Sequence, residues 1–162
     1  MAFIRTYESR DWQELLPILR ATFAAGDTYA FSPDSTEADI HRIWIEGPQA
    51  SYVIVADDGT VLGTYFIRAN QPGLGSHVCN CGYIVAESAR GQGLATQLCE
   101  HSQAEARRLG YRAMQYNLVV STNDVAVRLW KKLGYAIVGT LPGAFHHAKE
   151  GFVDAYVMFK TL

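Results

Sequence analysis

Hydrophobic and polar residues repeat with two periods along this chain, and the switch between them predicts an alternation of strands and helices. In the first half, short apolar runs predict strands over Phe3 to Tyr7, Tyr52 to Ala56 and Val61 to Arg68. Apolar residues three and four positions apart predict one helix that begins near Asp11 and a second over Asp34 to Glu46. The first half therefore predicts two helices between strands.

The second half continues this alternation. Its apolar runs predict strands over Val78 to Val85, Ala113 to Val119, Tyr135 to Thr140 and Phe152 to Lys160. Helices are predicted over Gln92 to Leu109, closed by Gly110, and over Asp124 to Leu133, closed by Gly134. In the second of these helices, the apolar residues spaced three and four apart are expected to be buried, namely Ala126, Leu129, Trp130 and Leu133. The elements fit one mixed α/β layer structure, and residues 1–162 are expected to form a single domain.

Turn-forming and capping residues mark where some of these elements end. The segment from Asp57 to Thr60 has the chemistry of a tight hairpin turn, which predicts antiparallel pairing of the strands on either side. Asp11, with Glu14 three residues later, forms the signature of a capping box. Pro17 lies inside the helix that follows and predicts a kink or a late start, because proline lacks a backbone N–H.

The overall composition limits the partners of this chain. Hydrophobic residues make up 49% and charged residues 19% of the sequence, which is ordinary for a globular protein. A net charge of −2 with scattered basic residues argues against a nucleic-acid partner. No apolar run approaches the roughly 18 residues of a membrane span, and the N-terminal residues lack the pattern of a signal peptide. We therefore expect neither a nucleic acid nor a membrane as a partner.

The cysteines indicate a compartment and raise the question of a metal site. Cys79, Cys81 and Cys99 are too few for a disulfide framework, which favours a reducing, cytoplasmic location. His77, Cys79 and Cys81 would share one face of a strand, as metal ligands could. The rise per residue would spread these three side chains over roughly 13 Å, however. Buried thiols are therefore favoured, and no metal site is predicted.

The segment from Tyr83 to Thr96 is the most informative one, because a strand there leads through a glycine-flanked turn into a helix. Gly91 and Gly93 allow positive φ and the close approach of an anion, while successive N–H groups point into one concavity. The helix adds the positive end of its dipole, and Arg90 adds a charged fork that matches phosphate oxygens. This turn is expected to bind a pyrophosphate-bearing cofactor.

The spacing of the glycines separates the possible cofactors. No run of Gly, four residues, Gly-Lys and Ser or Thr is present, which argues against an ATPase P-loop. In a dinucleotide-binding fold the third small residue would fall on Thr96, and the strand ending at Val119 lacks the carboxylate that holds a ribose. An ADP-containing dinucleotide is thus the weaker alternative. What remains is the pattern Arg90-x-x-Gly93-x-Ala95.

That pattern resembles the acetyl-coenzyme A loop of the GCN5-related N-acetyltransferase (GNAT) superfamily, which is Gln or Arg, two residues, Gly, one residue, then Gly or Ala. The segment from Ser121 to Tyr135 is similar to the second signature of the family, in which Asn123 precedes a helix that ends in Lys-x-Gly-aromatic. The resemblance covers residues 78–160 and implies a mostly antiparallel sheet of six to seven strands flanked by about four helices. It also implies acetyl-coenzyme A as co-substrate, with direct transfer of the acetyl group to an amine in a ternary complex.

The resemblance further implies which residues bind the cofactor. The main chain at Tyr83, Ile84 and Val85 would pair with pantetheine as an added strand would. Main-chain N–H groups would hold the pyrophosphate, assisted by the charge of Arg90, in the loop formed by Gly91, Gln92, Gly93, Leu94, Ala95 and Thr96. Asn123 would contact pantetheine, or would serve simply as the N-cap of the helix that follows it.

Trp130 departs from the family pattern. Many relatives carry at this position a tyrosine thought to protonate the leaving thiolate, and an indole N–H cannot act as a general acid. We expect Trp130 to form pocket wall or core, and a coenzyme A thiolate, whose thiol titrates near pH 8.5, to take its proton later from water. The missing acid also leaves open a protein of this fold that binds coenzyme A as a sensor and has lost catalysis.

On the acceptor side, Asn80, Tyr83 and Asn117 are the predicted catalytic residues. Asn80 and Asn117 lie in strands that are otherwise apolar, where an amide must find a partner, so they are candidates to hold a substrate carboxylate or amide. The segments around both resemble the fungal azetidine-2-carboxylate acetyltransferases and their bacterial relatives, which suggests a small cyclic or α-amino acid. Phosphinothricin-like and polyamine substrates stay open, because the two expected substrate loops, 26–34 and 142–151, carry no signal of specificity.

The base that deprotonates the amine is not singled out by spacing. A water-mediated base is one alternative, and the eligible side chains are Tyr83, Glu87, Tyr116, His146, His147 and Asp154. Relatives often form dimers, so the resemblance also allows a homodimer.

Overall fold

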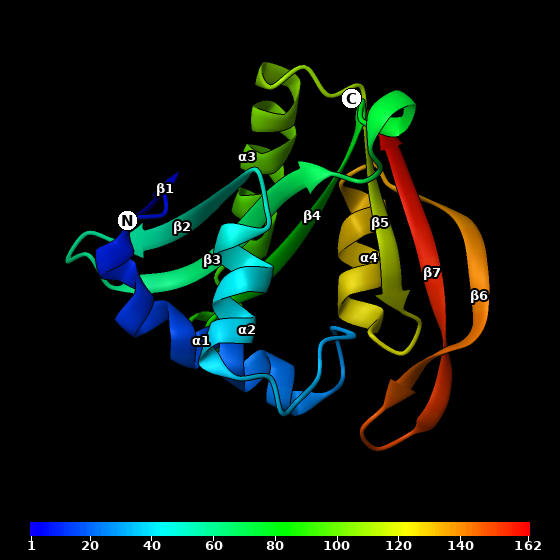
Figure 1. Ribbon diagram of the computed structural model, residues 1–162, viewed down its shortest axis with the longest axis horizontal. Helices are drawn as coiled ribbons and strands as arrows, with labels where there is room; N and C mark the ends of the chain where they lie inside the picture. The colour runs from blue at the N-terminus through cyan, green and yellow to red at the C-terminus, as the bar shows by residue number, and fades with distance from the viewer.

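The computed structural model of this protein describes residues 1–162 and contains one seven-stranded sheet flanked by four α-helices (Figure 1). The strands are β1 (Ala2–Thr6), β2 (Ala50–Ala56), β3 (Val61–Ala69), β4 (Val78–Val85), β5 (Ala113–Val120), β6 (Ala136–His147) and β7 (Gly151–Thr161). The helices are α1 (Trp12–Ala25), α2 (Glu37–His41), α3 (Leu94–Arg108) and α4 (Asp124–Lys132). The expected mixed α/β class, the number of strands and the number of helices are confirmed.

The strand order is β1-β2-β3-β4-β5-β7-β6, and every neighbouring pair but one is antiparallel. The exception is β4 with β5, which pair in parallel at only two positions, Val78 with Ala113 and Cys79 with Met114. Beyond these positions the two strands diverge, and Figure 1 shows them separating from their shared end. The sheet is therefore split in its middle, between two antiparallel halves.

Alternation along the strands sends side chains to the two faces of the sheet, and each face has its own core. One core gathers α1 and α2 around Val53, Phe66 and Ile84. The other gathers α3 around Tyr65 and Cys81, with side chains of α4 packed against it. A feature that lies at the split between β4 and β5 can thus be reached from both layers of helices.

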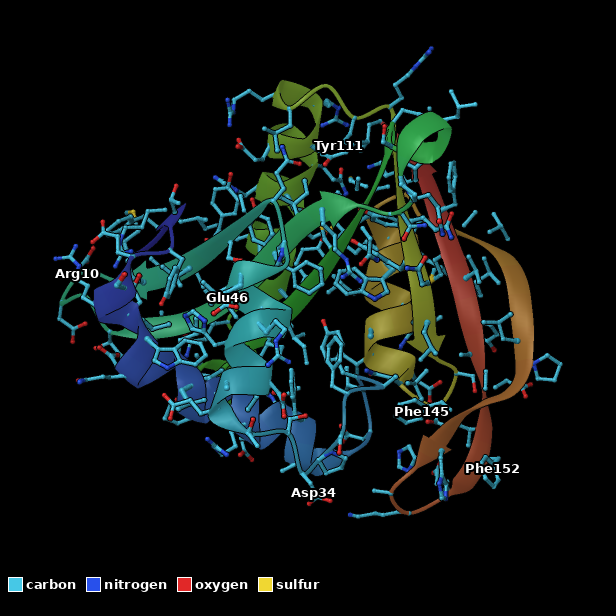
Figure 2. All side chains as sticks on the ribbon, viewed as in Figure 1. Arg10, Asp34, Glu46, Tyr111, Phe145 and Phe152 are labelled. Carbon is cyan, nitrogen blue, oxygen red and sulfur yellow. The ribbon has the colours of Figure 1, made fainter.

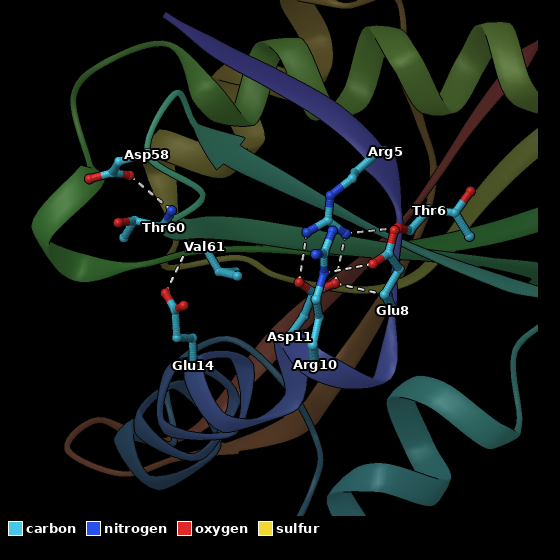
Figure 3. Close-up of polar contacts among 9 residues, drawn as sticks. All are labelled: Arg5, Thr6, Glu8, Arg10, Asp11, Glu14, Asp58, Thr60 and Val61. Carbon is cyan, nitrogen blue, oxygen red and sulfur yellow. Dashed lines mark hydrogen bonds and ion pairs between the residues drawn. The ribbon is translucent and has the colours of Figure 1, made fainter.

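The start of α1 differs from the sequence prediction. Asp11 does not cap the helix with its side chain, because its carboxylate forms two hydrogen bonds with the Arg5 guanidinium, at 2.7 and 2.8 Å, and accepts the Glu8 N–H (Figure 3). Glu14, the predicted partner in the capping box, instead accepts the N–H of Val61 at 3.0 Å. The capping-box prediction is therefore wrong, since both carboxylates are engaged by groups outside the helix.

Two element boundaries also differ, whereas α1 begins at Trp12, close to the expected Asp11, and runs through Pro17 without a late start. α2 begins at Glu37 rather than Asp34, since Thr36 supplies the N-cap oxygen for the Asp39 N–H, and a π-helical segment, Arg42–Glu46, follows it. β6 extends to His147, so most of the expected loop over 142–151 is strand.

The extension of β6 has a local cause. Its register against β7 shifts between Leu141 and Phe145, which absorbs Pro142 and Gly143 in an irregularity of an outer strand. Proline is tolerated there because an outer strand has no second neighbour that needs its N–H. Figure 2 shows Phe145 and Phe152 on the β6–β7 hairpin that results.

The hairpin from Asp57 to Thr60 is confirmed. The Gly59 N–H donates to the Ala56 carbonyl at 2.9 Å, Gly59 has a φ of +90°, and β2 and β3 pair antiparallel on either side.

The cysteines Cys79, Cys81 and Cys99 are all buried free thiols. No group of three or more His, Cys, Asp or Glu side chains is arranged to hold a metal ion. No helix has the length and apolar character needed to cross a membrane.

Candidate active site

A cavity of about 670 Å³ lies where β4 and β5 diverge. Its walls come from β3, β4, β5, α4 and the segment between α1 and α2, together with Arg90, Ala95 and His147. Because the cavity passes between two strands of one sheet, it borders both layers of helices. Two molecules can therefore approach the same strand edge from opposite faces.

Asn80 stands at the point where the strands part. It is 8% exposed, lies one residue beyond the last β4–β5 pair, and donates from Nδ2 to the carbonyl oxygen of Gln115 in β5 at 2.9 Å. The side-chain amide thus satisfies a carbonyl that has lost its strand partner. Its own carbonyl oxygen accepts no hydrogen bond from the protein, and Asn80 lines the cavity.

Asn117 lies farther along β5, where the register against β7 shifts between Tyr116 and Val119. Its Oδ1 accepts from Gln115 Nε2 at 3.0 Å, and its Nδ2 donates to Asn70 Oδ1 at 2.7 Å. Asn117 is exposed and lines the cavity. The two predicted asparagines therefore border one cavity, and both are oriented by hydrogen bonds to neighbouring groups.

The edge of β4 that faces the gap is defined by backbone alternation. The Ala86 N–H donates to the carbonyl of Leu62 in β3, so the even-numbered residues of β4, Ile84 among them, direct their main-chain groups to β3. Tyr83 and Val85 direct theirs into the gap. The Tyr83 groups are occupied: its N–H donates to the Tyr29 hydroxyl at 2.6 Å, and that hydroxyl donates to the Tyr83 carbonyl at 2.9 Å.

The glycine turn has the geometry that its sequence predicts. Gly91 and Gly93 have φ of +76° and +74°, and a β-carbon at either position would meet nothing within 4 Å. Gly93 precedes α3 without a side-chain cap, and the first N–H bond into the helix runs from Gln97 to the Gly93 carbonyl, at 3.2 Å. The N–H groups of the first turn of this 15-residue helix therefore point outward, where an anion is stabilised.

Arg90 and Ala95 connect this turn to the cavity, which both residues line. Arg90 is exposed and forms no salt bridge within the protein. The remaining residues of the turn, Gly91, Gln92, Gly93, Leu94 and Thr96, lie outside the cavity lining. The glycine turn therefore lies beside the cavity, and Arg90 and Ala95 are its residues that reach the lining.

α4 forms a cavity wall rather than a purely buried helix. Ala126, Leu129 and Trp130 line the cavity and stay partly exposed, whereas Val127 is the buried residue of this helix. The prediction that this apolar face is core is therefore wrong in part, because a cavity wall and a core face have the same hydrophobic pattern. Asn123 is the N-cap, with Oδ1 accepting the Ala126 N–H at 3.2 Å, and it also borders the cavity.

Trp130 packs against aromatic rings of the sheet. Its ring centroid lies 5.2 Å from that of Tyr83 and 5.1 Å from that of Tyr116. The Tyr116 hydroxyl donates to the Tyr83 hydroxyl at 2.9 Å, and the latter also contacts Ser102 Oγ at 2.7 Å. Burial raises the pKa of both phenols well above the ordinary value. Neither Tyr83 nor Tyr116 is therefore suited to act as a base near neutral pH.

The other candidates for the base are separated by position. His147 lines the cavity, but its Nδ1 accepts the N–H groups of Lys149 and Glu150 at 3.1 and 3.2 Å, so the neutral ring carries its proton on Nε2. Glu87, His146 and Asp154 lie outside the cavity lining. The only carboxylate among the lining residues is Asp27, which sequence reasoning missed.

Sequence reasoning also missed Arg68 among the residues that line the cavity. Arg68 lines the cavity with no salt bridge, and its guanidinium carbon lies 5.4 Å from the centroid of the Phe66 ring. A β-carbon at Gly82 would lie 2.6 Å from that ring, so the Phe66 ring packs against the backbone of β4 and the guanidinium lies over the ring. Arg68 lies opposite Asn80 in the register of β3 and β4. A prediction of that register from the sequence would have placed Arg68 beside the candidate residue Asn80.

Comparison with known proteins agrees with this geometry. Residues 12–135 match the acetyltransferase (GNAT) family. A solved GCN5-related N-acetyltransferase from Kribbella flavida is 43% identical, with a TM-score of 0.94 over 99% of this chain and 98% of that chain. A solved phosphinothricin acetyltransferase from Sinorhizobium meliloti, in complex with AcCoA, is 19% identical, with a TM-score of 0.86 over 99% of this chain and 88% of that one. At that identity the likeness shows the fold alone.

The fold and the cavity define the GNAT class, and the match over most of the sequence shows that this chain belongs to the acetyltransferase (GNAT) family. Among curated proteins, N-acetyltransferase aca1 of Schizosaccharomyces pombe is 36% identical over 99 residues, which are 60% of this chain. The matched region spans 47% of aca1, about half of its length.

Proposed function

We propose that residues 1–162 act as one acetyltransferase domain that transfers the acetyl group of acetyl-coenzyme A to the amine of a small molecule. The observation that carries this proposal is the split between β4 and β5, which opens a strand edge to both layers of helices beside a glycine turn suited to phosphate. Family membership and the likeness to a solved GCN5-related N-acetyltransferase support it. The complex of the Sinorhizobium meliloti relative with AcCoA supports the choice of co-substrate.

Acetyl-coenzyme A fits the groups that the site offers. The pyrophosphate would be held by main-chain N–H groups of Gly91 to Thr96 and by the charge of Arg90. Pantetheine would run along the edge of β4 at Tyr83 and Val85, between that strand and the apolar wall of α4, with Asn123 at the end of the wall. Ile84 contributes a buried side chain to this strand rather than main-chain groups.

The acceptor would approach from the side of α1 and α2. Arg68 offers an unpaired guanidinium, Asn80 an unpaired carbonyl oxygen, and Asn117 an amide held in place by Gln115. A positive charge and amide groups beside the reacting edge suit a molecule that carries a carboxylate next to its amine. This favours a small amino acid, such as azetidine-2-carboxylate or another proline analogue, over a polyamine.

In the reaction, the amine nitrogen attacks the thioester carbonyl, a C–N bond forms, the C–S bond breaks, and coenzyme A leaves as a thiolate. Main-chain N–H groups at the β4 edge would stabilise the negative charge that develops on the carbonyl oxygen. The amine proton would leave by water toward Asp27, the carboxylate of the cavity. Trp130 has an indole N–H without a protein partner and would hydrogen-bond the departing thiolate without protonating it.

A coenzyme A sensor without catalysis is the second candidate, favoured by the tryptophan at position 130. Thiol release from acetyl-coenzyme A decides between the two, measured against a panel of azetidine-2-carboxylate, proline analogues, phosphinothricin, polyamines and short peptides. Thiol release that depends on an amine is expected, with the highest kcat/KM for an acceptor that bears a carboxylate. Binding of coenzyme A without turnover on any amine would favour the sensor.

Two asparagine variants test the acceptor site separately from the cofactor site. Asn117→Ala and Asn80→Ala are expected to raise the KM of the acceptor about tenfold, the effect of losing one hydrogen bond to a charged group, while leaving the Kd of acetyl-coenzyme A unchanged. Asn80→Ala also leaves the Gln115 carbonyl without its hydrogen-bond donor, so the effect of Asn117→Ala on the acceptor KM is easier to interpret. Unaltered acceptor KM in both would remove the asparagines from the site.

A further inference from the structure

Tyr29 comes from the segment between α1 and α2, 54 residues away from Tyr83 in sequence, yet its hydroxyl lies on the open edge of β4. The hydroxyl accepts the Tyr83 N–H at 2.6 Å and donates to the Tyr83 carbonyl at 2.9 Å. One oxygen thus satisfies both main-chain groups of a single strand residue. These are the groups that a neighbouring strand would otherwise satisfy.

The strand is shaped to admit this hydroxyl. A β-carbon at Gly82 would lie 3.2 Å from the Tyr29 oxygen and 2.6 Å from the Phe66 ring, so only glycine leaves room for both. The Tyr29 ring is held by aromatic neighbours, with centroids 5.7 Å from Phe31 and 5.8 Å from Trp44. Burial raises the pKa of the Tyr29 phenol, which therefore stays protonated and able to donate.

The segment that carries Tyr29 has little else to fix it. Residues 27–31 make no main-chain hydrogen bond with any other main-chain group. The hydroxyl and the ring contacts are therefore what hold this part of the loop against β4. A ligand that took over the Tyr83 groups would therefore displace the hydroxyl without breaking a main-chain hydrogen bond of this segment.

We propose that Tyr29 acts as a stand-in for the bound cofactor, which means that it competes with it for the same main-chain groups. Its hydroxyl binds the N–H and the carbonyl of Tyr83 in the free protein, and it leaves them when the acyl-pantetheine part of acetyl-coenzyme A binds. The inference rests on the proposed function, because it takes acetyl-coenzyme A as the ligand that replaces the hydroxyl. Without this hydroxyl, the main-chain N–H and carbonyl of Tyr83 would have no protein partner in the free protein, which costs free energy where they are partly buried. The hydroxyl removes that penalty and competes with the cofactor.

The competition couples the two halves of the cavity. Asp27, Thr28 and Phe31, which line the acceptor side, belong to the same segment as Tyr29. When the cofactor displaces the hydroxyl, this segment becomes free to close on an acceptor. Acetyl-coenzyme A is therefore expected to bind first.

Tyr29→Phe tests the inference, because it keeps the ring packing and removes only the hydroxyl. Its Kd for acetyl-coenzyme A is expected to fall about fivefold, the effect of one net hydrogen bond no longer broken on binding. The Kd for 3′-phosphoadenosine 5′-diphosphate, the nucleotide end of coenzyme A without pantetheine, is expected to stay unchanged. This probe reaches the glycine turn but not the β4 edge.

Tyr111→Phe is the matched control, since the Tyr111 hydroxyl bonds only to the side chain of Gln49, outside the cavity lining. Figure 2 shows Tyr111 at the opposite end of the molecule from Asp34, which belongs to the α1–α2 segment. This control is expected to leave both Kd values at the wild-type level. Tyr29→Leu, which also lacks the hydroxyl, serves as a second variant should Tyr29→Phe be unstable.

The outcomes separate the two proposals. If the wild-type protein fails to bind acetyl-coenzyme A, the proposed function fails and this inference fails with it. If the wild type binds acetyl-coenzyme A but the Tyr29 variants bind it no more tightly, the stand-in is refuted and the proposed function stands. Equal tightening for acetyl-coenzyme A and the nucleotide fragment would also refute it, because the effect would then lie outside the strand edge.

Discussion

Replacing Gly93 by valine tests the role of the glycine turn alone, without changing any other part of the candidate site. Gly93 has a φ of +74°, and a β-carbon there would meet nothing within 4 Å. The added β-carbon therefore creates no clash, and the main effect of the substitution comes from the backbone. A β-branched residue is a genuine outlier at positive φ, so the turn is expected to leave the left-handed conformation.

The magnitude follows from two contributions. Restoring the left-handed conformation with a β-carbon present costs about 1–2 kcal/mol, which alone weakens cofactor binding about tenfold. Loss of one charge-assisted hydrogen bond from a main-chain N–H to phosphate adds about 1.5 kcal/mol, another factor of about ten. The Kd of acetyl-coenzyme A is therefore expected to rise between about tenfold and about 100-fold in Gly93→Val.

Gly59→Val provides a matched control within the same chain. Gly59 has a φ of +90°, a β-carbon there would also meet nothing within 4 Å, and the residue lies in the β2–β3 hairpin outside the cavity lining. Both variants bear the same kind of strain, but only one bears it in the proposed phosphate turn. Isothermal titration gives Kd, and urea unfolding confirms that both variants fold. A Kd for Gly93→Val within threefold of that for Gly59→Val would refute the assignment of the turn.

Two further predictions concern the leaving group and an ion pair distant from the site. Trp130→Tyr is expected not to raise kcat, because thiolate departure does not require an acid; a gain of tenfold or more would show that an acid had been missing. The hydrogen bonds from Arg5 hold the pKa of Asp11 below its ordinary value, so this carboxylate contributes stability that is complete above about pH 5 and is lost as pH falls through its folded-state pKa. Asp11→Asn is therefore expected to lower the free energy of unfolding at pH 7 by about 2 kcal/mol, with the difference from wild type shrinking below about pH 4. Urea titrations from pH 3 to pH 7 measure this, and a constant difference would contradict the reasoning.

The features that could be predicted from the sequence are those in which neighbours along the chain determine the structure. The glycine turn at Gly91 and Gly93 and the hairpin at Gly59 have positive φ. Glycine is the residue type that adopts positive φ most readily, so the sequence alone indicates these turns. The α1 capping box failed for the opposite reason. Arg5 lies across the helix start and withdraws Asp11 from its local role through a tertiary contact that no local pattern encodes.

The pattern of α4 shows a second limit. Residues spaced three and four apart mark a face hidden from bulk water, but they do not say whether protein or ligand covers that face. Ala126 and Leu129 were expected to be buried and instead line the cavity, together with Trp130, which was expected as pocket wall or core. In a family whose co-substrate carries a long pantetheine arm, an apolar wall for that arm has the same sequence pattern as a wall for another helix.

Tyr29 shows why part of the proposed acceptor half of the site could not be predicted. Asn80 and Asn117 were identifiable because polar residues inside apolar strands need an explanation, and each explanation lies within the sheet. Tyr29 lies in a segment rich in turn residues, where an aromatic residue has no such contrast with its surroundings. Its partner is a main-chain edge that exists only because β4 and β5 separate after Cys79 and Met114. A residue whose role is to satisfy backbone leaves no side-chain partner in the sequence, so its function becomes visible only once the strands are placed.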